Sequence, residues 1–415
     1  MELPTLDSAR LENRRVLMRI DINSPIEPST GTILDDTRMR SHIATIDELS
    51  GSRLVLLAHQ SRPGLEDFTT LEAHSRRLSQ LLNRDVRYVD DVFGRAAREE
   101  IRRLRRGEVL LLENVRFCSE EVVAEVRSKP PAAQANTNLV RKLSSYVEAY
   151  VNDAFAVAHR TQPSVVAFPV VLPSYAGKLL EREVENLTKV LKSRERPKVF
   201  SFGGAKVGDS LMVMEKLLSR DVADVVLTSG MVANIFLVAR GIDIGEVNLR
   251  VMDEKGLTPL VAHARKLLEK YGEKIQMPTD LALKKNGSRA EAGVEELPDL
   301  MIMDIGIDTI ARYSSIIENA AVVAANGPAG VFEIREFALG SEALVKAMAR
   351  CRGFTVIGGG HLAAIAAKRG LRDKISFIST GGKAMLLFLA GEKLPGIEVL
   401  REAGKNDAGN SGGLG

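Results

Sequence analysis

The sequence predicts an α/β fold with two parallel-sheet domains joined by a helical hinge. Short apolar runs alternate with segments of helical periodicity along the whole chain. The runs are continuously apolar, as expected for parallel strands that are buried on both faces. The chain has 415 residues, more than one ordinary hydrophobic core contains. Together these observations predict two domains of Rossmann-like architecture.

The expected strands follow one another in two groups. In the N-terminal half the apolar runs are RVLMRI, RLVLLA, VRYV, VLLL and YVN, at 15–20, 53–58, 86–89, 109–112 and 150–152. In the C-terminal half they lie at 198–202, 224–227, 300–304, 321–325, 354–357 and 375–378. Helical patterns separate most of these runs, so we expect parallel strands throughout.

A domain boundary is expected near residues 168–195, where the two prolines of FPVVLPS are followed by one long amphipathic helix, YAGKLLEREVENLTKVLKSRERP. Its apolar face carries Leu180, Val184, Leu187 and Leu191, and Pro197 ends it. The predicted organisation is an N-terminal domain, a hinge helix, a C-terminal domain and a C-terminal segment, at 1–170, 171–195, 196–395 and 396–415. The last eleven residues, KNDAGNSGGLG, are expected to form a mobile tail.

Composition excludes several classes of protein. The net charge is only +3, too mild to indicate nucleic-acid binding. The basic run at 95–108 is interpreted as a solvated helix face with pairs of the Glu99–Arg103 type. Cys118 and Cys351 are too few for a cysteine-rich zinc site and indicate a reducing compartment. The N-terminus has no apolar signal region, and no run is long enough to span a bilayer. We therefore expect a cytoplasmic protein without nucleic-acid or membrane partners.

Basic side chains follow the expected strands of the N-terminal half. Ligands of open parallel sheets bind at the carboxyl ends of the strands. The residues found there, or just behind them, are Asp21, Asn23, Arg38, His59, Arg62, Arg116, His159 and Arg160. For any one arginine a surface ion pair is the better explanation. Basic groups at four strand ends of one sheet favour a small, multiply charged anion, which guanidinium groups bind bidentately.

Glycine-rich loops follow the strands of the C-terminal half. They are FGGAK, NGPAGVFE, IGGGHLAA and STGGKAM, beginning at 202, 326, 357 and 379. One glycine pair is often only a tight turn. Four such loops, with Lys206, favour a nucleotide whose phosphates approach helix N-termini. The P-loop pattern is absent.

A dinucleotide-binding pattern is also present but incomplete. Residues 358–363 match G-x-G-x-x-A, but the acidic residue expected about 20 positions later is replaced by Ser379-Thr380. Glu333 is the carboxylate available for a ribose. An anion site in one half and a nucleotide site in the other predict phosphoryl transfer, with hinge closure to exclude water.

The sequence resembles phosphoglycerate kinases over nearly its whole length. The matching motifs are RIDINSP, DDTR, LLAHQSRPG, LLENVRF, YVNDAFAVAHR, GGAKV, ANGPAGVFE, VIGGGH and STGGKA, in that order. The positions at which the sequence departs from the family pattern, described below, resemble those of archaeal members. The resemblance implies a glycolytic phosphotransferase with a carboxyl group as acceptor. Its substrates would be 1,3-bisphosphoglycerate with MgADP, and 3-phosphoglycerate with MgATP. It would act as a monomer.

The resemblance also implies site residues. 3-Phosphoglycerate would contact Asp21, Asn23, Arg38, His59, Arg62, Arg116 and Arg160. The nucleotide would contact Lys206, Asn326, Glu333, Gly358, Gly359, Gly360, His361 and Thr380, with Glu333 on the ribose. Arg38, Lys206 and the amides of Gly381 and Gly382 would stabilise the transferring phosphoryl group. The acceptor carboxylate is already ionised, so no general base is needed.

The sequence departs from the family pattern at several positions. Ser210 stands where the family has a lysine, and His361 stands where the family has an aspartate that holds Mg²⁺ in the metal–nucleotide complex. Neutral imidazole is a poor ligand for this hard cation, so no protein ligand for Mg²⁺ is assigned. Thr161-Gln162 is a minor change. Lys383, in place of a glycine, is expected to restore part of the missing positive charge.

Three other functions stay open at this point. The first is a nucleotide-binding protein that has lost phosphoryl transfer through Ser210 and His361. The second is a dinucleotide-dependent dehydrogenase, suggested by GGGHLA. The third is a nucleic-acid binder, suggested by the arginines. Neither of the last two explains why basic groups occupy one half and glycine loops the other.

Overall fold

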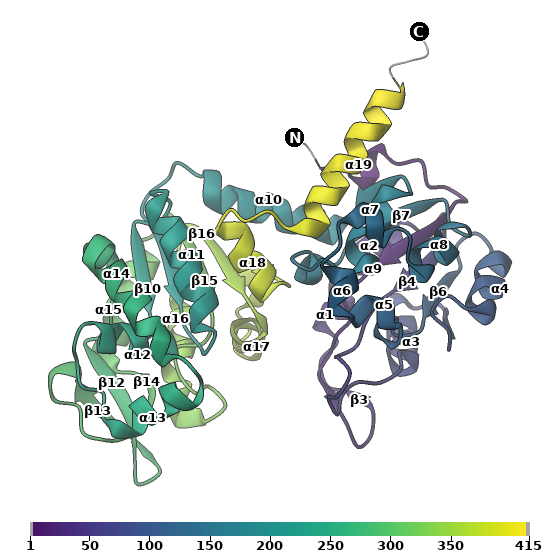
Figure 1. Ribbon diagram of the computed structural model, residues 1–415. Coiled ribbons are helices and arrows are strands. Elements are labelled where there is room, and N and C mark those ends of the chain that lie inside the picture. Colours follow the sequence, from purple (N-terminus) through teal and green to yellow (C-terminus); the bar gives the residue numbers. More distant parts are fainter. Residues whose placement is uncertain (1–2, 412–415) are drawn as a thin grey trace. The chain divides into compact units, whose positions relative to one another are not determined.

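The computed structural model describes residues 3–411 and divides the chain into two compact units (Figure 1). Unit 1 comprises residues up to Glu185 together with those from Lys393 onward. Unit 2 runs from Asn186 to Glu392. The chain thus returns to unit 1 after completing unit 2, and helix α10 (Lys178–Lys192) contains the first division. Both units have the α/β architecture that the sequence predicts.

Unit 1 is built on a six-stranded parallel sheet. Its strands, in spatial order, are β5 (Val86–Val89), β6 (Val109–Leu112), β4 (Arg53–Leu57), β1 (Arg15–Arg19), β7 (Ala149–Asn152) and β8 (Ser174–Ala176). Successive residues of a strand enter opposite cores: Val16 and Met18 pack in one cluster, and Leu17 in the other. Both faces are therefore buried, which explains the continuously apolar strands.

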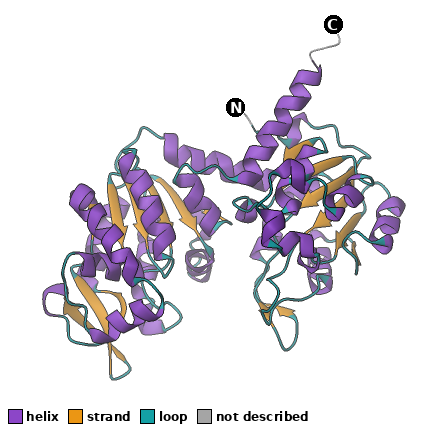
Figure 2. Cartoon of the chain, viewed as in Figure 1, coloured by secondary structure: helices purple, strands orange, loops and turns teal. Residues whose placement is uncertain are grey.

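Helices cover the two faces of this sheet, as the purple and orange elements of Figure 2 show. The helices of unit 1 are α1 (Thr37–Ser41), α2 (Ile43–Glu48), α3 (Glu72–Leu82), α4 (Arg95–Arg103), α5 (Ser119–Val122), α6 (Ala124–Arg127), α7 (Pro131–Gln134), α8 (Asn138–Ser144), α9 (Pro163–Val166) and α19 (Pro395–Ser411), the last of which lies against the edge strand β8. A small hairpin, β2 (Ile26–Glu27) and β3 (Thr32–Ile33), precedes α1. Helix α4 carries the expected Arg103–Glu99 pair, at 4.0 Å.

Unit 2 contains a second six-stranded parallel sheet. Its strands, in spatial order, are β11 (Ile275–Gln276), β10 (Val225–Thr228), β9 (Lys198–Phe202), β15 (Val322–Asn326), β16 (Phe354–Gly358) and β17 (Phe377–Ser379). Its helices are α11 (Val207–Ser219), α12 (Gly230–Ala239), α13 (Glu246–Glu254), α14 (Val261–Tyr271), α15 (Ile307–Glu318), α16 (Leu339–Arg350), α17 (Gly360–Lys368) and α18 (Gly382–Leu389).

The expectation of parallel strands is wrong for the run at 300–304. It forms β14 (Ile302–Ile305) in a separate antiparallel sheet with β12 (Asp280–Lys285) and β13 (Ser288–Gly293). The hairpin turns at Asn286-Gly287, which have φ angles of 51° and 84°. Asn-Gly is the strongest short hairpin signal, because both residues tolerate positive φ.

Two details of the helices also differ from expectation. In α10, Leu180 and Leu187 are buried, but Glu183 and Val190 are buried instead of Val184 and Leu191. Positions i+3 and i+4 lie on one side of a helix, so periodicity alone does not choose between them. Residues 405–411, expected in a mobile tail, continue α19 because an established helix extends by one hydrogen bond per residue. The rest of that expected tail, 412–415, lies outside the described residues.

Candidate active site

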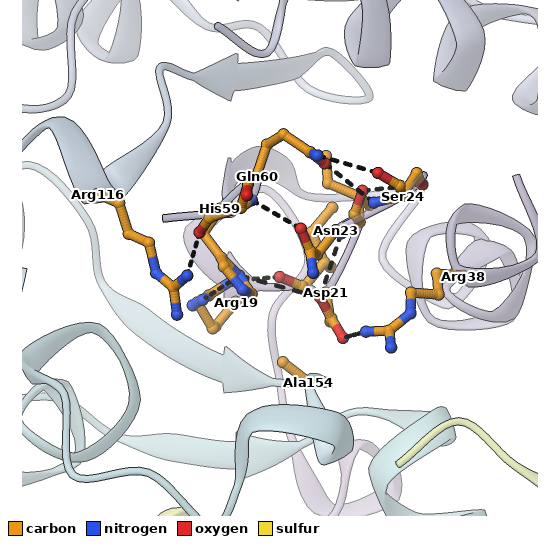
Figure 3. Close-up of polar contacts among 12 residues, drawn as sticks. Arg19, Asp21, Asn23, Ser24, Arg38, His59, Gln60, Arg116 and Ala154 are labelled. Carbon is orange, nitrogen blue, oxygen red and sulfur yellow. Dashed lines mark hydrogen bonds and ion pairs between the residues drawn. The ribbon is translucent and has the colours of Figure 1, made fainter. Parts of the chain in front are cut away.

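The polar residues predicted after β1 and β4 lie together at the carboxyl edge of the unit 1 sheet (Figure 3). Asp21 is buried and accepts a hydrogen bond from Arg38 of α1. Asn23 accepts from the backbone N–H of Ser61 at 2.7 Å. His59 is also buried, and its Nδ1 lies 3.9 Å from Asp21 Oδ1. Adjacent parallel strands thus bring residues nearly 40 positions apart into one cluster, which we call the unit 1 polar cluster.

Arg116 and Arg160 add positive charge to the unit 1 polar cluster. Arg116 donates to the carbonyl of Ser61. Burial and the nearby Arg160 and Arg19 lower the pKa of Arg116 to about 10. Burial also lowers the pKa of Arg160, opposed by the nearby Asp21. Burial is the main cause of both shifts, and the repulsion among these guanidinium groups adds to it, so a polyanion would relieve that repulsion.

His59 is kept neutral by the same surroundings. Burial lowers its pKa well below the usual 6.5, and Arg19, Arg116, Arg160 and Arg38 lower it further. Of the other predicted residues, Arg62 is exposed, and Asn23, Arg38, His159 and Arg160 are half-buried. In the described part of the chain, no ion pair involves Arg62.

Sequence reasoning missed Arg19 and Gln60. Gln60 exchanges two hydrogen bonds with the backbone of Ser24, through Oε1 at 3.0 Å and Nε2 at 2.9 Å, and so joins the loops after β1 and β4. Arg19 is only 1% exposed, and its guanidinium contacts the ring of His59. The available signal was a charged residue inside the apolar run RVLMRI, because a buried charge requires partners.

In unit 2 the loop at Gly203-Gly204 packs against the loop at Gly327-Pro328. The Gly203 amide donates to Asn326 O at 2.9 Å, and the Gly204 amide donates to Pro328 O at 2.8 Å. A Cβ on Gly203 would lie 2.3 Å from Pro328 O. These glycines therefore permit contact between two backbones, and their amides are already used within the protein. Lys206 is the exposed cationic group of this loop.

Asn326 points an unused amide toward the other glycine loops. Its Nδ2 is buried without a hydrogen-bond partner. A Cβ atom added to Gly359 or to Gly382 would lie 3.7 Å from this Nδ2 atom. Gly359 directly precedes α17, and Gly382 is the first residue of α18. Because first-turn amides of a helix lack intrahelical partners, two helix N-termini and one side-chain donor converge here. The Gly381 amide already donates to Ser379 Oγ at 3.2 Å.

Gly358 and Gly360 differ in their surroundings. A Cβ on Gly358 would lie 2.1 Å from Met385 Cε, whereas one on Gly360 would meet nothing within 4 Å. Gly358 therefore serves packing, and Gly360 faces open space. Thr380 lies in the loop between β17 and α18.

A cavity of about 250 Å³ opens beside these loops. Its lining is mainly apolar and includes Met231, Leu281, Ile302 and Val331. Glu333 and His361 also line it, and the His361 ring lies 5.0 Å from that of Phe332. An apolar slot with a carboxylate suits a base and a ribose.

Lys383 and Asp209 form an ion pair at 3.1 Å between α18 and the first turn of α11. Ser210 is buried, and its hydroxyl donates to Lys206 O at 3.2 Å. A cation thus lies against α11 one residue from the serine. The charge of Lys383 is paired with Asp209 in this structure, and its compensating role stays a prediction.

The described side chains do not form a magnesium site of their own. Within residues 3–405, whose side chains are described, no three acidic, histidine or cysteine side chains gather in a way that could hold a metal. His361 offers only an imidazole where a hard cation prefers oxygen. No helix of the described chain is long and apolar enough to cross a membrane.

Comparisons with known proteins identify the family. The model of the family described as phosphoglycerate kinase matches residues 6–392. The chain is 52% identical over 403 residues to phosphoglycerate kinase of Methanothermus fervidus, covering 97% of each chain. It is 50% identical to that of Methanothermobacter thermautotrophicus, covering 96% of this chain and 97% of the other. A crystal structure of phosphoglycerate kinase from Pyrococcus horikoshii has a TM-score of 0.92 and 43% identity, covering 97% of this chain and 100% of the other. The chain belongs to the phosphoglycerate kinase family.

Proposed function

We propose that the unit 1 polar cluster binds 3-phosphoglycerate and that the glycine loops and cavity of unit 2 bind the adenine nucleotide. The chain is a phosphotransferase that moves a phosphoryl group reversibly between 1,3-bisphosphoglycerate and ADP, as its family does. The observation that carries the site assignment is the convergence of Arg38, Arg116 and Arg160 on a buried, neutral His59. Asp21 and Glu121 offset part of this positive charge, and a bound anion would offset the rest.

In the unit 1 site, Asp21, Asn23 and His59 are proposed to orient the substrate by hydrogen bonds. Arg38, Arg62, Arg116 and Arg160 neutralise its phosphate and carboxylate. Guanidinium groups make paired hydrogen bonds to such oxygens, so the cluster both binds and orients the anion. This assigns substrate binding to the domain at 1–170.

In the unit 2 site, the apolar cavity is proposed to take the adenine, and Glu333 the ribose hydroxyls. Asn326, Lys206, the loop Gly358 to Gly360 with His361, and Thr380 contact the phosphates. Mg²⁺ enters as part of the MgADP or MgATP substrate, bound by phosphate oxygens. This assigns nucleotide binding to the domain at 196–395. We further propose a monomer that works in the cytoplasm.

The chemistry needs positioning and charge neutralisation but no general base. A carboxylate of 3-phosphoglycerate is ionised at neutral pH and can attack directly. Arg38, Lys206 and the amides at the start of α18 are proposed to stabilise negative charge during an in-line transfer. The neutral His59 fits this scheme, because it provides a hydrogen bond rather than a proton acceptor.

A coupled assay with 3-phosphoglycerate, ATP and Mg²⁺ tests this assignment. We expect Arg38→Ala and Lys206→Ala to lower kcat by about 100-fold or more. Arg40→Ala is the control on α1, where the Arg40 guanidinium pairs with Asp36 at 2.8 Å, and Lys216→Ala is the control on α11, the helix that Lys206 precedes, where Lys216 pairs with Glu392 at 3.6 Å. Both controls should retain most activity. Equal losses in a target and its control would refute the assigned role, and ATP binding without turnover in the parent would indicate a binding protein.

A further inference from the structure

Arg19 is a buried arginine whose guanidinium is held by four groups. Its Nε donates to Ser164 Oγ at 3.1 Å. Its Nη1 donates to the carbonyl of Leu57 at 3.3 Å and to that of Ile20. Its Nη2 lies 3.1 Å from His59 Nδ1. With all three nitrogens engaged inside the protein, this guanidinium has one fixed orientation, shown beside His59 in Figure 3.

A buried carboxylate balances the charge of Arg19 through Ser164. The Ser164 hydroxyl donates to Glu121 Oε1 at 2.6 Å, and the Ser164 backbone N–H donates to Oε2 at 3.1 Å. Glu121 is itself fully buried. Arg19 therefore belongs to a closed polar network and differs from the partly exposed Arg38, which is 40% exposed at its side chain.

The contact between Arg19 and His59 determines which imidazole nitrogen carries the hydrogen. A guanidinium has only N–H donors and no acceptor. The Nδ1 atom of His59 must therefore offer its lone pair, and the hydrogen of the neutral ring must lie on Nε2. The opposite tautomer would direct two N–H groups at each other.

Among the residues that the structure describes, no competing acceptor favours the other tautomer. Asp21 Oδ1 is the nearest carboxylate oxygen to Nδ1, but at 3.9 Å it is beyond hydrogen-bond range, against 3.1 Å for Arg19. Burial and the neighbouring guanidinium groups keep the ring neutral, since they lower the pKa of His59. Among the described residues, Nε2 has no hydrogen-bond partner. The Nε2–H group of His59 is thus available to donate a hydrogen bond to a ligand.

We propose that Arg19 is a positioning residue that locks His59 in the Nε2–H tautomer, so that His59 gives the bound anion a neutral hydrogen-bond donor. A neutral donor binds an anionic oxygen without adding a further charge to a site already crowded with arginines. The identity of the anion rests on the proposed function, but the tautomer does not.

Nitrogen-15 NMR of the full chain, labelled at its six histidines, tests the proposal directly. The His59 signals are assigned as those lost in His59→Gln. We expect two-bond proton–nitrogen couplings typical of the Nε2–H tautomer at pH 7 without ligand, and a shift of Nε2 when 3-phosphoglycerate is added. An Nδ1–H pattern in the parent would overturn the proposal. If turnover is normal but the His59 signals do not shift on addition of 3-phosphoglycerate, the proposed donor role of His59 is wrong. The proposed kinase activity would not be affected by that result.

Variants of Arg19 distinguish its proposed effect on the His59 tautomer from an effect on folding. Arg19→Met alone leaves Glu121 buried without its counter-charge, so the double variant Arg19→Met/Glu121→Gln is the main test. We expect it to mix the His59 tautomers and to raise KM for 3-phosphoglycerate about tenfold, with KM for ATP unchanged. The matched control is Arg15→Met at the other end of β1, where Arg15 lies 4.0 Å from Glu148. A double variant that folds, keeps the Nε2–H pattern and keeps its KM would refute the positioning role.

Discussion

The Nδ1 atom of His42 lies 2.7 Å from Oδ2 of Asp153, and both side chains are buried. Asp153 Oδ1 accepts the backbone N–H of Leu179 at 2.9 Å and so caps the start of α10. His42 Nε2 accepts the backbone N–H of Asp21 at 3.0 Å. One buried pair therefore connects the proposed substrate site with the helix that leaves unit 1.

This relationship makes Asp153→Asn informative. An asparagine keeps the shape but has one oxygen where Asp153 uses two, so either His42 or the Leu179 amide faces an N–H₂ group and loses its acceptor. We expect the free energy of unfolding to fall by about 2 kcal/mol, because buried partners are left unsatisfied. KM for 3-phosphoglycerate should rise as well. Denaturant titration and steady-state kinetics measure the two effects.

The control for that variant is Asp7→Asn. Asp7 also serves the start of α10, through an ion pair with Lys178 at 2.5 Å, but it is 69% exposed. An exposed ion pair contributes little. If both variants behaved alike, the buried connection from Asp21 to α10 would have no special role.

His74 predicts how stability changes in acid. It lies on α3 with Nε2 3.1 Å from Gln60 Oε1, and burial lowers its pKa from 6.5 to about 4. Between these two pH values the unfolded chain binds a proton that the native chain does not, so stability falls as the pH falls from 6.5 to 4. The contribution is at most about 3 kcal/mol. In His74→Leu the loss of stability over this range should be smaller by that amount, as denaturant titrations at pH 7.5, 6, 5 and 4 would show. Parallel curves would contradict the prediction.

Replacing glycine by alanine is predicted to have opposite effects on stability at Gly203, in the loop before α11, and at Gly208, inside α11. Gly203→Ala places a Cβ 2.3 Å from Pro328 O and should destabilise the protein by about 3 kcal/mol. Gly208→Ala, five residues later inside α11, meets only Leu260 at 3.8 Å. There alanine should stabilise by about 0.5–1 kcal/mol, because it reduces the freedom of the unfolded chain. Thermal unfolding distinguishes the two, and equal effects would disprove the packing role of the loop.

Lys383 is predicted to compensate for Ser210. Lys383→Ala should lower kcat by about 100-fold, because a cation beside the transferring group stabilises its charge. Lys368→Ala, at the C-terminal end of α17, is the control. Adding Ser210→Lys to Lys383→Ala should restore part of the rate. Unchanged turnover in Lys383→Ala would remove this residue from the mechanism.

The strands and the loops that follow them could be predicted from the sequence because their signals are local. A continuous apolar run such as RVLMRI specifies a strand buried on both faces, and the order of strands and helices specifies parallel pairing. The carboxyl ends of such strands meet at one edge, so Asp21, His59 and Arg116 could be expected to lie near one another before their contacts were known.

The use of each polar group was decided only by tertiary structure. Arg19 meets Ser164 across 145 positions, and no pattern within a strand identifies that partner. The amides of Gly203 and Gly204 are occupied by the loop at 326–328, which pairing of β9 with β15 brings alongside. Local sequence determines which backbone shapes are possible. Which donor finds which acceptor depends on contacts between distant segments, and those form only when the sheets assemble.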